Sequence, residues 1–179
     1  MGARESWERW RRVQARHAWV RWSVDLLLLL LVASAVMAWQ TRRLPEAGTP
    51  APAFALRTLG GETVRLEALR GRPVALTFWA PWCTVCKAES SNLSALQRRV
   101  GERAHVLSVA VAYDDVEEVR RFAREQGVDY PVLLGDDALQ RAYNVDTFPT
   151  TLFLSPEGRV TRAAVGYTTQ LGLLWRLWL

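Results

Sequence analysis

Cys83-Thr84-Val85-Cys86 is the segment whose residue types and spacing point most directly to chemistry. Its cysteines are the only two in the chain. Placed at random, two cysteines would fall three positions apart roughly once in a hundred times. An apolar β-type run, Pro73–Ala80, precedes the pair, and Lys87–Val100 has the pattern of a helix. Because unpaired backbone N–H groups at a helix start stabilise a thiolate, this spacing indicates thiol–disulfide exchange.

Other chemistries are open to the same pair. A static disulfide and one half of a copper or zinc site both use two cysteines at this distance. The chain has no further cysteine, and His17 and His105 lie far from the pair in sequence. We therefore expect no metal site and no cofactor.

The elements that must position the pair alternate between strands and helices. Seven strands are expected, at Ala53–Leu56, Thr63–Leu66, Val74–Trp79, Ala104–Ala112, Tyr130–Leu134, Thr150–Leu154 and Arg159–Val165. Helices are expected after the cysteines, from Asp114 as a capping residue to Gly127, over Asp136–Tyr143 and over Thr168–Trp178. The last of these is expected to bury one stripe, formed by Leu171, Leu174, Trp175 and Trp178. This order predicts an α/β fold with a mixed central sheet and helices on both faces.

The N-terminal quarter has the pattern of a membrane anchor. Trp22–Thr41 is apolar except for Asp25, and its 20 residues would span about 30 Å as a helix. Arginines are more numerous before this segment than after it, which predicts a cytoplasmic tail over 1–21. The domains expected are this tail, a transmembrane signal anchor over 22–41, a linker over 42–52 and a folded domain over 53–179. A cleaved signal peptide with its site at Ala33-Ser34-Ala35 is the alternative.

The charge distribution argues against nucleic acid as a partner. Residues 1–43 hold eight arginines and three acidic side chains, out of 23 basic and 18 acidic residues in the whole chain. The rest of the chain is therefore neutral overall, although the whole sequence has a pI of about 9.9. A neutral domain offers no electrostatic footprint for DNA or RNA.

Several motifs together resemble the membrane-anchored TlpA/ResA/DsbE-type branch of thioredoxin-fold proteins. The stretch Phe78–Cys86 (FWAPWCTVC) is similar to their active-site segment, and Phe148–Leu154 (FPTTLFL) is similar to their later strand. Pro52–Leu56, Leu69–Pro73 and Glu157-Gly158 add to the resemblance, which covers about residues 50–179. It implies a thioredoxin-like fold preceded by one transmembrane helix.

The resemblance also implies roles for the matched residues. Cys83 would be the exposed nucleophile and Cys86 the resolving thiol. Pro149 would be a cis-proline facing the disulfide, and Glu89 would be an acidic group near the buried thiol. Trp82 and Phe148 would be apolar contacts for an extended substrate. From the residues alone, Glu89 could equally be a solvated helix residue and Pro149 a trans proline of an edge strand.

Three positions depart from the branch. Val85 stands where many members have proline. A Pro-Val pair between the cysteines is familiar from copper-stress members of the branch, and this chain shares only the valine. Ser91 replaces a helix-kinking proline, and Thr77 occupies the place of thioredoxin's buried aspartate.

The function expected is reduction of disulfides in partner proteins by an enzyme of the inner membrane whose catalytic domain faces the periplasm. The partners implied are apocytochrome c or another periplasmic protein, and a membrane thiol donor of the DsbD/CcdA type. An oxidase or isomerase on the same fold, and a non-enzymatic copper- or zinc-binding module, are the alternatives.

Overall fold

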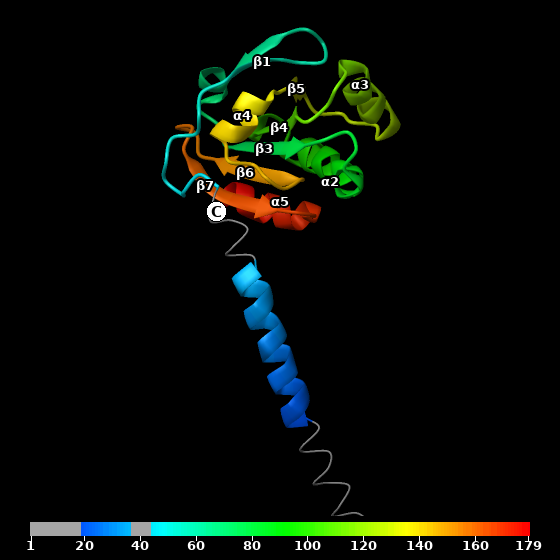
Figure 1. The fold of residues 1–179 in the computed structure, drawn as a ribbon. Coiled ribbons are helices and arrows are strands. Elements are labelled where there is room, and N and C mark those ends of the chain that lie inside the picture. The colour runs from blue at the N-terminus through cyan, green and yellow to red at the C-terminus, as the bar shows by residue number, and fades with distance from the viewer. Residues whose placement is uncertain (1–18, 37–43) are drawn as a thin grey trace, which may run out of the picture. The chain divides into compact units, whose positions relative to one another are not determined.

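The computed structural model describes residues 19–36 and 44–179 and divides the chain into two units, Met1–Arg42 and Arg43–Leu179. In the first unit, the described residues form one helix, Trp19–Val36, which is long and apolar enough to cross a membrane. It matches most of the expected anchor (Figure 1). Most of the expected cytoplasmic tail and the last residues of the expected anchor lie outside the described residues.

A five-stranded mixed sheet forms the centre of the second unit, in the order β5-β4-β3-β6-β7 (Figure 1). A separate hairpin pairs β1 with β2. The strands are β1 (Ala55–Arg57), β2 (Thr63–Arg65), β3 (Val74–Trp79), β4 (His105–Ala110), β5 (Val132–Leu134), β6 (Thr150–Leu154) and β7 (Val160–Val165). The helices are η1 (Leu66–Leu69), α2 (Thr84–Val100), η2 (Gly101–Arg103), α3 (Val116–Glu125), α4 (Asp137–Ala142) and α5 (Gln170–Trp178). The expected α/β fold with a mixed sheet is confirmed.

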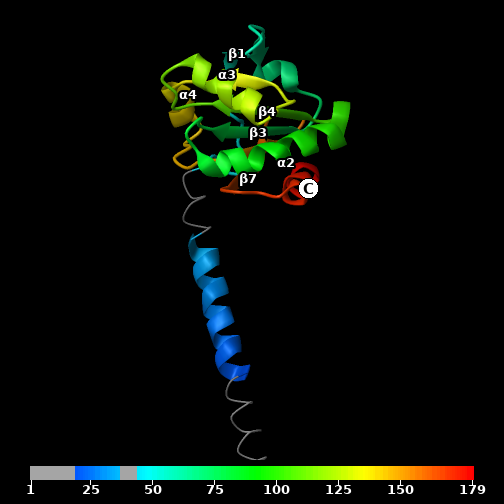
Figure 2. The same ribbon diagram turned by 90° about the vertical axis from the view of Figure 1, so that its right-hand side faces the viewer.

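Strand pairing explains where the cysteines lie. β3 runs parallel to β4 and antiparallel to β6, and all six of its residues are buried. Helices α2 and α3 each return the chain to a parallel neighbouring strand, as crossover connections do. The cysteines lie at the start of α2, which follows the central strand β3 and packs beside it on the sheet (Figure 2).

Two apolar clusters cover the two faces of the sheet. One packs α2, α3 and α5 against the face that includes Ala75, Trp79 and Phe153. The other packs α4, η1 and the segment before β1 against the face that includes Leu76 and Phe78. Alternate residues of β3 therefore point to opposite clusters, as the two-residue period of a strand requires.

Three details of the fold differ from the sequence predictions. Leu44 and Ala51 are buried, so the described part of the expected linker over 42–52 is anchored to the domain at these two residues. Asp115, not Asp114, caps α3 by accepting a hydrogen bond from the Glu117 N–H. On α5 the buried residues are Leu173 and Leu177, and most of the expected stripe is exposed.

Candidate active site

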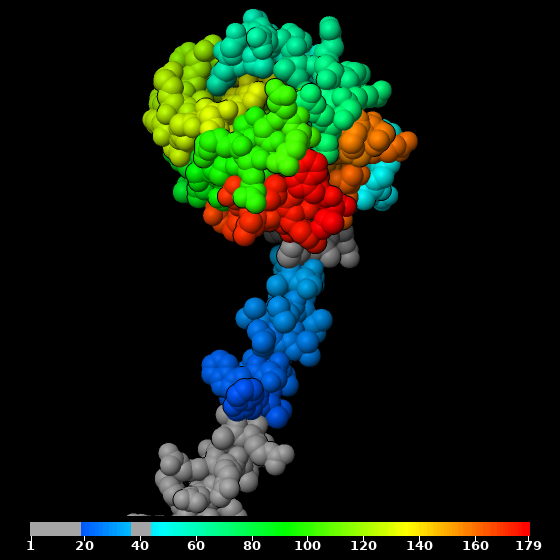
Figure 3. Space-filling view, turned by 180° about the vertical axis from the view of Figure 1, so that it is seen from behind, coloured from blue at the N-terminus to red at the C-terminus, as the bar shows by residue number. Residues whose placement is uncertain are grey.

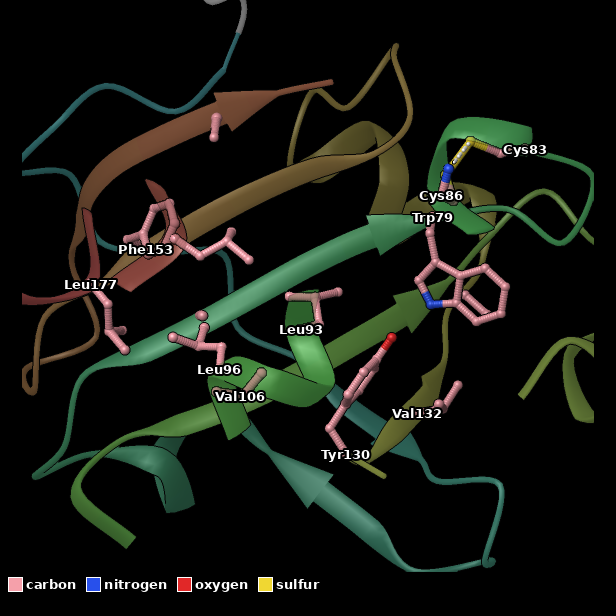
Figure 4. Packing of buried hydrophobic residues seen from close by; sticks show 14 of the residues in the cluster. Trp79, Cys83, Cys86, Leu93, Leu96, Val106, Tyr130, Val132, Phe153 and Leu177 are labelled. Carbon is pink, nitrogen blue, oxygen red and sulfur yellow. Dashed lines mark hydrogen bonds between the residues drawn. A yellow bond between two sulfur atoms is a disulfide. The ribbon is translucent and has the colours of Figure 1, made fainter. Parts of the chain in front are cut away.

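The disulfide between Cys83 and Cys86 lies at the start of α2 (Figure 4). Cys83 is the N-cap residue of the helix, and the two Cα atoms are 5.3 Å apart. The backbone N–H of Cys86 donates a hydrogen bond to the Sγ atom of Cys83 at 3.1 Å. When the disulfide is reduced, the same donor and the helix dipole favour negative charge on Cys83.

Neither sulfur-bearing residue is exposed in this oxidised form. Cys83 is 6% exposed and Cys86 is 4% exposed, so the expected exposure of Cys83 is wrong for the disulfide state. Both side chains belong to the apolar cluster that includes Trp79 and Ala80. The surface over the disulfide comes from its neighbours instead, because Trp82 and Val85 are exposed.

Trp82 is held in place although 66% of it is exposed. Its indole N–H donates to the carbonyl oxygen of Ala112 at 2.9 Å, across the loop that follows β4. Ala112 has a positive φ of 50°, which only a minority of non-glycine residues adopt. The Trp82 ring also meets the Phe148 ring edge-on, with centroids 5.8 Å apart. The structure therefore brings together the two aromatic residues expected to contact substrate.

Pro149 follows a cis peptide bond from Phe148 and leads into β6. This is the cis form that the resemblance implies, and it excludes the trans alternative. Pro149 lines a small cavity together with Cys86, so the proline lies against the inner side of the redox pair. Its carbonyl oxygen accepts a hydrogen bond from Gly166 at 2.8 Å, which fastens this loop to the end of β7.

Glu89 is buried inside the domain and is not a solvated helix residue. Only 1% of it is exposed, and its Oε1 atom accepts a hydrogen bond from the Thr168 N–H at 2.8 Å. Its other carboxyl oxygen, Oε2, is buried without a hydrogen-bond partner. Burial raises the pKa of Glu89 from 4.5 to about 7, against the smaller opposing effect of the Thr168 hydrogen bonds.

Glu89 and Cys86 line the same cavity, which has a volume of about 10 Å³. That volume is roughly enough for one water molecule. Tyr130 and Trp79 also line it, and the Trp79 indole nitrogen is a second buried group without a hydrogen-bond partner. Burial, and then the neighbouring Glu89 carboxylate, raise the pKa of Tyr130, so its hydroxyl stays protonated. Cys86 thus lines the same small cavity as a buried carboxyl group whose pKa is raised to about 7.

Thr77 is buried and lines the same cavity as Glu89. Its hydroxyl shares a 2.8 Å hydrogen bond with the hydroxyl of Thr151, between β3 and β6. This agrees with the sequence interpretation that the position holds a buried, hydrogen-bonded hydroxyl. Glu89 is therefore the acidic group of the pocket.

A groove of about 390 Å³ adjoins the redox pair on the side of α3. Its walls carry both signs of charge and one exposed aromatic ring. The lining residues are Pro81, Trp82, Lys87, Ala112, Asp114, Glu118, Arg121, Phe122 and Glu125. The α3 side of this groove is the part of the site that sequence analysis missed, since no short motif links α3 to the cysteines.

A cysteine pair at the first turn of the helix after a central strand, facing a cis-proline, defines a thioredoxin-like protein. The chain belongs to the AhpC/TSA family, whose family model matches residues 47–163. It is 32% identical over 157 residues to the thioredoxin-like protein YneN of Bacillus subtilis, which covers 84% of this chain and 92% of YneN.

Two further proteins extend the comparison. The thiol-disulfide oxidoreductase ResA of Bacillus subtilis is 32% identical over 125 residues, covering 69% of each chain. A thiol:disulfide interchange protein of the thioredoxin family from Chlorobium tepidum has a similar solved structure, with a TM-score of 0.66 and 25% identity. That similarity covers 72% of this chain and 93% of the other.

Proposed function

We propose that this protein is a thiol–disulfide oxidoreductase, anchored in the inner membrane, that reduces disulfides in partner proteins of the periplasm. The observation that carries the proposal is the Cys83–Cys86 disulfide at the start of α2, with the Cys86 N–H directed at the Cys83 sulfur. The relationship to ResA, a thiol-disulfide oxidoreductase, supports the same activity.

The reaction begins with the reduced pair. The Cys83 thiolate attacks one sulfur of a substrate disulfide, which forms a mixed disulfide and releases the other substrate sulfur as a thiolate. Cys86 then attacks the Cys83 sulfur, which breaks the mixed disulfide and releases the second substrate sulfur. Two electrons pass from the dithiol to the substrate, and the enzyme is left with the disulfide seen in the structure.

Glu89 is the residue we assign to the proton of Cys86. A carboxyl group with a pKa of about 7 is near half-ionised at neutral pH, so it can both take up and return a proton. The cavity shared with Cys86 gives room for one bridging water between the thiol and the carboxyl group.

The substrate is assigned to the exposed surface beside the disulfide. Trp82 and Phe148 supply apolar contact, and the groove along α3 would receive the chain that flanks the substrate cysteine. The backbone beside cis-Pro149 would pair with that extended segment. Apocytochrome c or another periplasmic disulfide protein is the proposed substrate, and a membrane thiol transporter of the DsbD/CcdA type is the proposed electron donor.

The location rests on the N-terminal helix and on the arginines around it. Trp19–Val36 would be about 27 Å long, which is close to the thickness of a hydrocarbon core. The excess of arginine before this helix favours a cytoplasmic N-terminus and a periplasmic catalytic domain.

Trapping experiments in cells test the activity. The variant Cys86→Ala should accumulate mixed disulfides through Cys83, which reducing agent releases and mass spectrometry identifies. The matched variant Cys83→Ala should accumulate far fewer. Equal trapping by both variants, or trapping by neither, would contradict the proposed division of roles.

A redox titration against glutathione tests the direction of electron flow. Reduction requires a potential near that of thioredoxin, about −270 mV, whereas a value near about −120 mV would assign the protein as an oxidase.

A further inference from the structure

Helix α5 leaves a large apolar face open to solvent. The sequence pattern predicts that this face is buried, but Leu171 is 70% exposed, Trp175 is 58% exposed and Trp178 is 46% exposed. Tyr167, just before the helix, and Leu179, just after it, are exposed as well. In Figure 3 the surface of α5, drawn in red, lies open beside α2 and β7. We name the set Tyr167, Leu171, Trp175, Trp178 and Leu179 the α5 patch.

Three arginines border the two tryptophans of the α5 patch. The guanidinium groups of Arg162 and Arg176 each lie 5.8 Å from the ring centre of Trp175. Arg103 lies 5.9 Å from the ring centre of Trp178. The helix itself carries one charged residue, Arg176, and no acidic residue. Exposed tryptophan and leucine bordered by arginine is the composition of helices that lie in the headgroup region of a bilayer.

The arginines around the α5 patch also favour a bilayer over a second copy of this chain as the surface that the patch contacts. A symmetric dimer through the α5 patch would bring both copies of these arginines into one interface, and α5 has no acidic residue to pair with them. An anionic lipid surface instead complements them, and each arginine near such a surface strengthens binding about fivefold.

The short segment between the apolar helix and the domain would keep the domain close to the bilayer that holds the helix. Leu44, the first described residue of the domain, is buried, and it lies only eight positions after Val36, the last described residue of the apolar helix. Eight residues extend at most about 30 Å. Within the domain, Gly48 and Thr49 hydrogen bond to Val160 at the start of β7, the strand that also carries Arg162.

We propose that the α5 patch docks the catalytic domain on an anionic lipid surface, with the tryptophans at the headgroup level and the arginines on lipid phosphates. The bilayer is the one that holds the anchor, so the inference rests on the anchoring part of the proposed function. Docking would fix which way the disulfide faces, while the anchor alone only limits its distance from the membrane.

Photo-crosslinking of the full chain in proteoliposomes tests this docking. A benzophenone amino acid replaces Trp175 in the patch or, as a control, the exposed Arg124 of α3, which lies toward the opposite edge of the sheet. In vesicles of phosphatidylcholine and phosphatidylglycerol, position 175 should form lipid adducts several-fold more often than position 124. Adducts to a second copy of the chain, or lipid adducts no more frequent than at position 124, would overturn the proposal.

Two further variants test the role of the arginines and the role of the anchor separately. Replacing Arg162 and Arg176 with glutamine should lower the ratio of docked to undocked domain about 25-fold in the anionic vesicles. An unchanged lipid yield at position 175 would overturn the role of the arginines.

The same probe in place of Leu28, within the apolar helix, tests the anchor separately. Lipid adducts at position 28 without adducts at position 175 would refute docking and leave the anchor standing.

Discussion

Replacing Glu89 with glutamine should remove a pH dependence from the stability of the oxidised protein. The pKa of this carboxyl group is 4.5 when exposed and about 7 in the fold, where burial disfavours its charge. Between these values the folded state binds the proton that the unfolded state has lost, so stability falls as pH rises through this window. The full cost is about 3 kcal/mol above pH 7, and it is below about 1 kcal/mol at pH 5.

Glutamine keeps an oxygen for the Thr168 N–H but carries no charge at either pH. Any cost of its new amide group is the same at both values and cancels in the comparison. The free energy of unfolding of Glu89→Gln, relative to the parent chain, should therefore rise by about 2 to 3 kcal/mol between pH 5 and pH 8. Urea unfolding of the oxidised full chain in detergent micelles measures this difference.

The matched control is Glu125→Gln, which removes an exposed carboxylate from α3. Its relative stability should change by less than about 0.5 kcal/mol between the two pH values. A change below about 1 kcal/mol for Glu89→Gln would refute the reasoning, because it would mean that the buried carboxyl group does not hold its proton near neutral pH.

Two packing predictions follow from buried contacts. Thr77→Val or Thr151→Val alone should cost about 1 to 3 kcal/mol, because each leaves the other buried hydroxyl unpaired, whereas the double variant should cost less than the sum. A double-mutant cycle by urea unfolding checks this, and strict additivity would contradict the shared hydrogen bond. Gly135→Ala should cost about 1 to 3 kcal/mol, since its Cβ would lie 2.6 Å from the Val109 side chain. Unchanged stability in the same assay would contradict this prediction, because it would mean that the Val109 side chain on β4 can move aside without loss of stability.

The sheet could be predicted from the sequence because its strands are distinctive locally. The bounds of β3 and β6 agree with the expected Val74–Trp79 and Thr150–Leu154. Both strands are buried on both faces, so their short runs of apolar and β-branched residues identify them without knowledge of their neighbours. The helix after the cysteines could also be predicted, from the helical pattern of Lys87–Val100.

The face of α5 could not be predicted, because this helix is apolar almost all round. Leu173 and Leu177 pack into the cluster that includes Phe153 and Ala164, while Trp175 stays outside. Periodicity finds a buried stripe only where the other face is polar, and α5 has a single charged residue, Arg176.

The surroundings of Glu89 also depend on distant contacts. Thr168 lies 79 positions from Glu89 in the sequence, and its N–H meets the carboxyl group only because α5 packs beside α2. The sequence placed Glu89 near the cysteines, but its burial, the orphaned oxygen and the cavity shared with Tyr130 come from the tertiary structure. The sequence could predict that Glu89 lies near the cysteines. It could not predict the buried surroundings that raise the pKa of Glu89.

Alkylation of the reduced full chain tests the central claim most directly. Iodoacetamide, with mass spectrometry of the modified peptides, gives the rate at each cysteine as pH is varied. The position of Cys83 as N-cap predicts that it reacts much faster than Cys86 at pH 7, with a midpoint well below the ordinary thiol pKa of about 8.5. A midpoint at or above that value, or equal rates at both cysteines, would contradict a stabilised thiolate at the helix start.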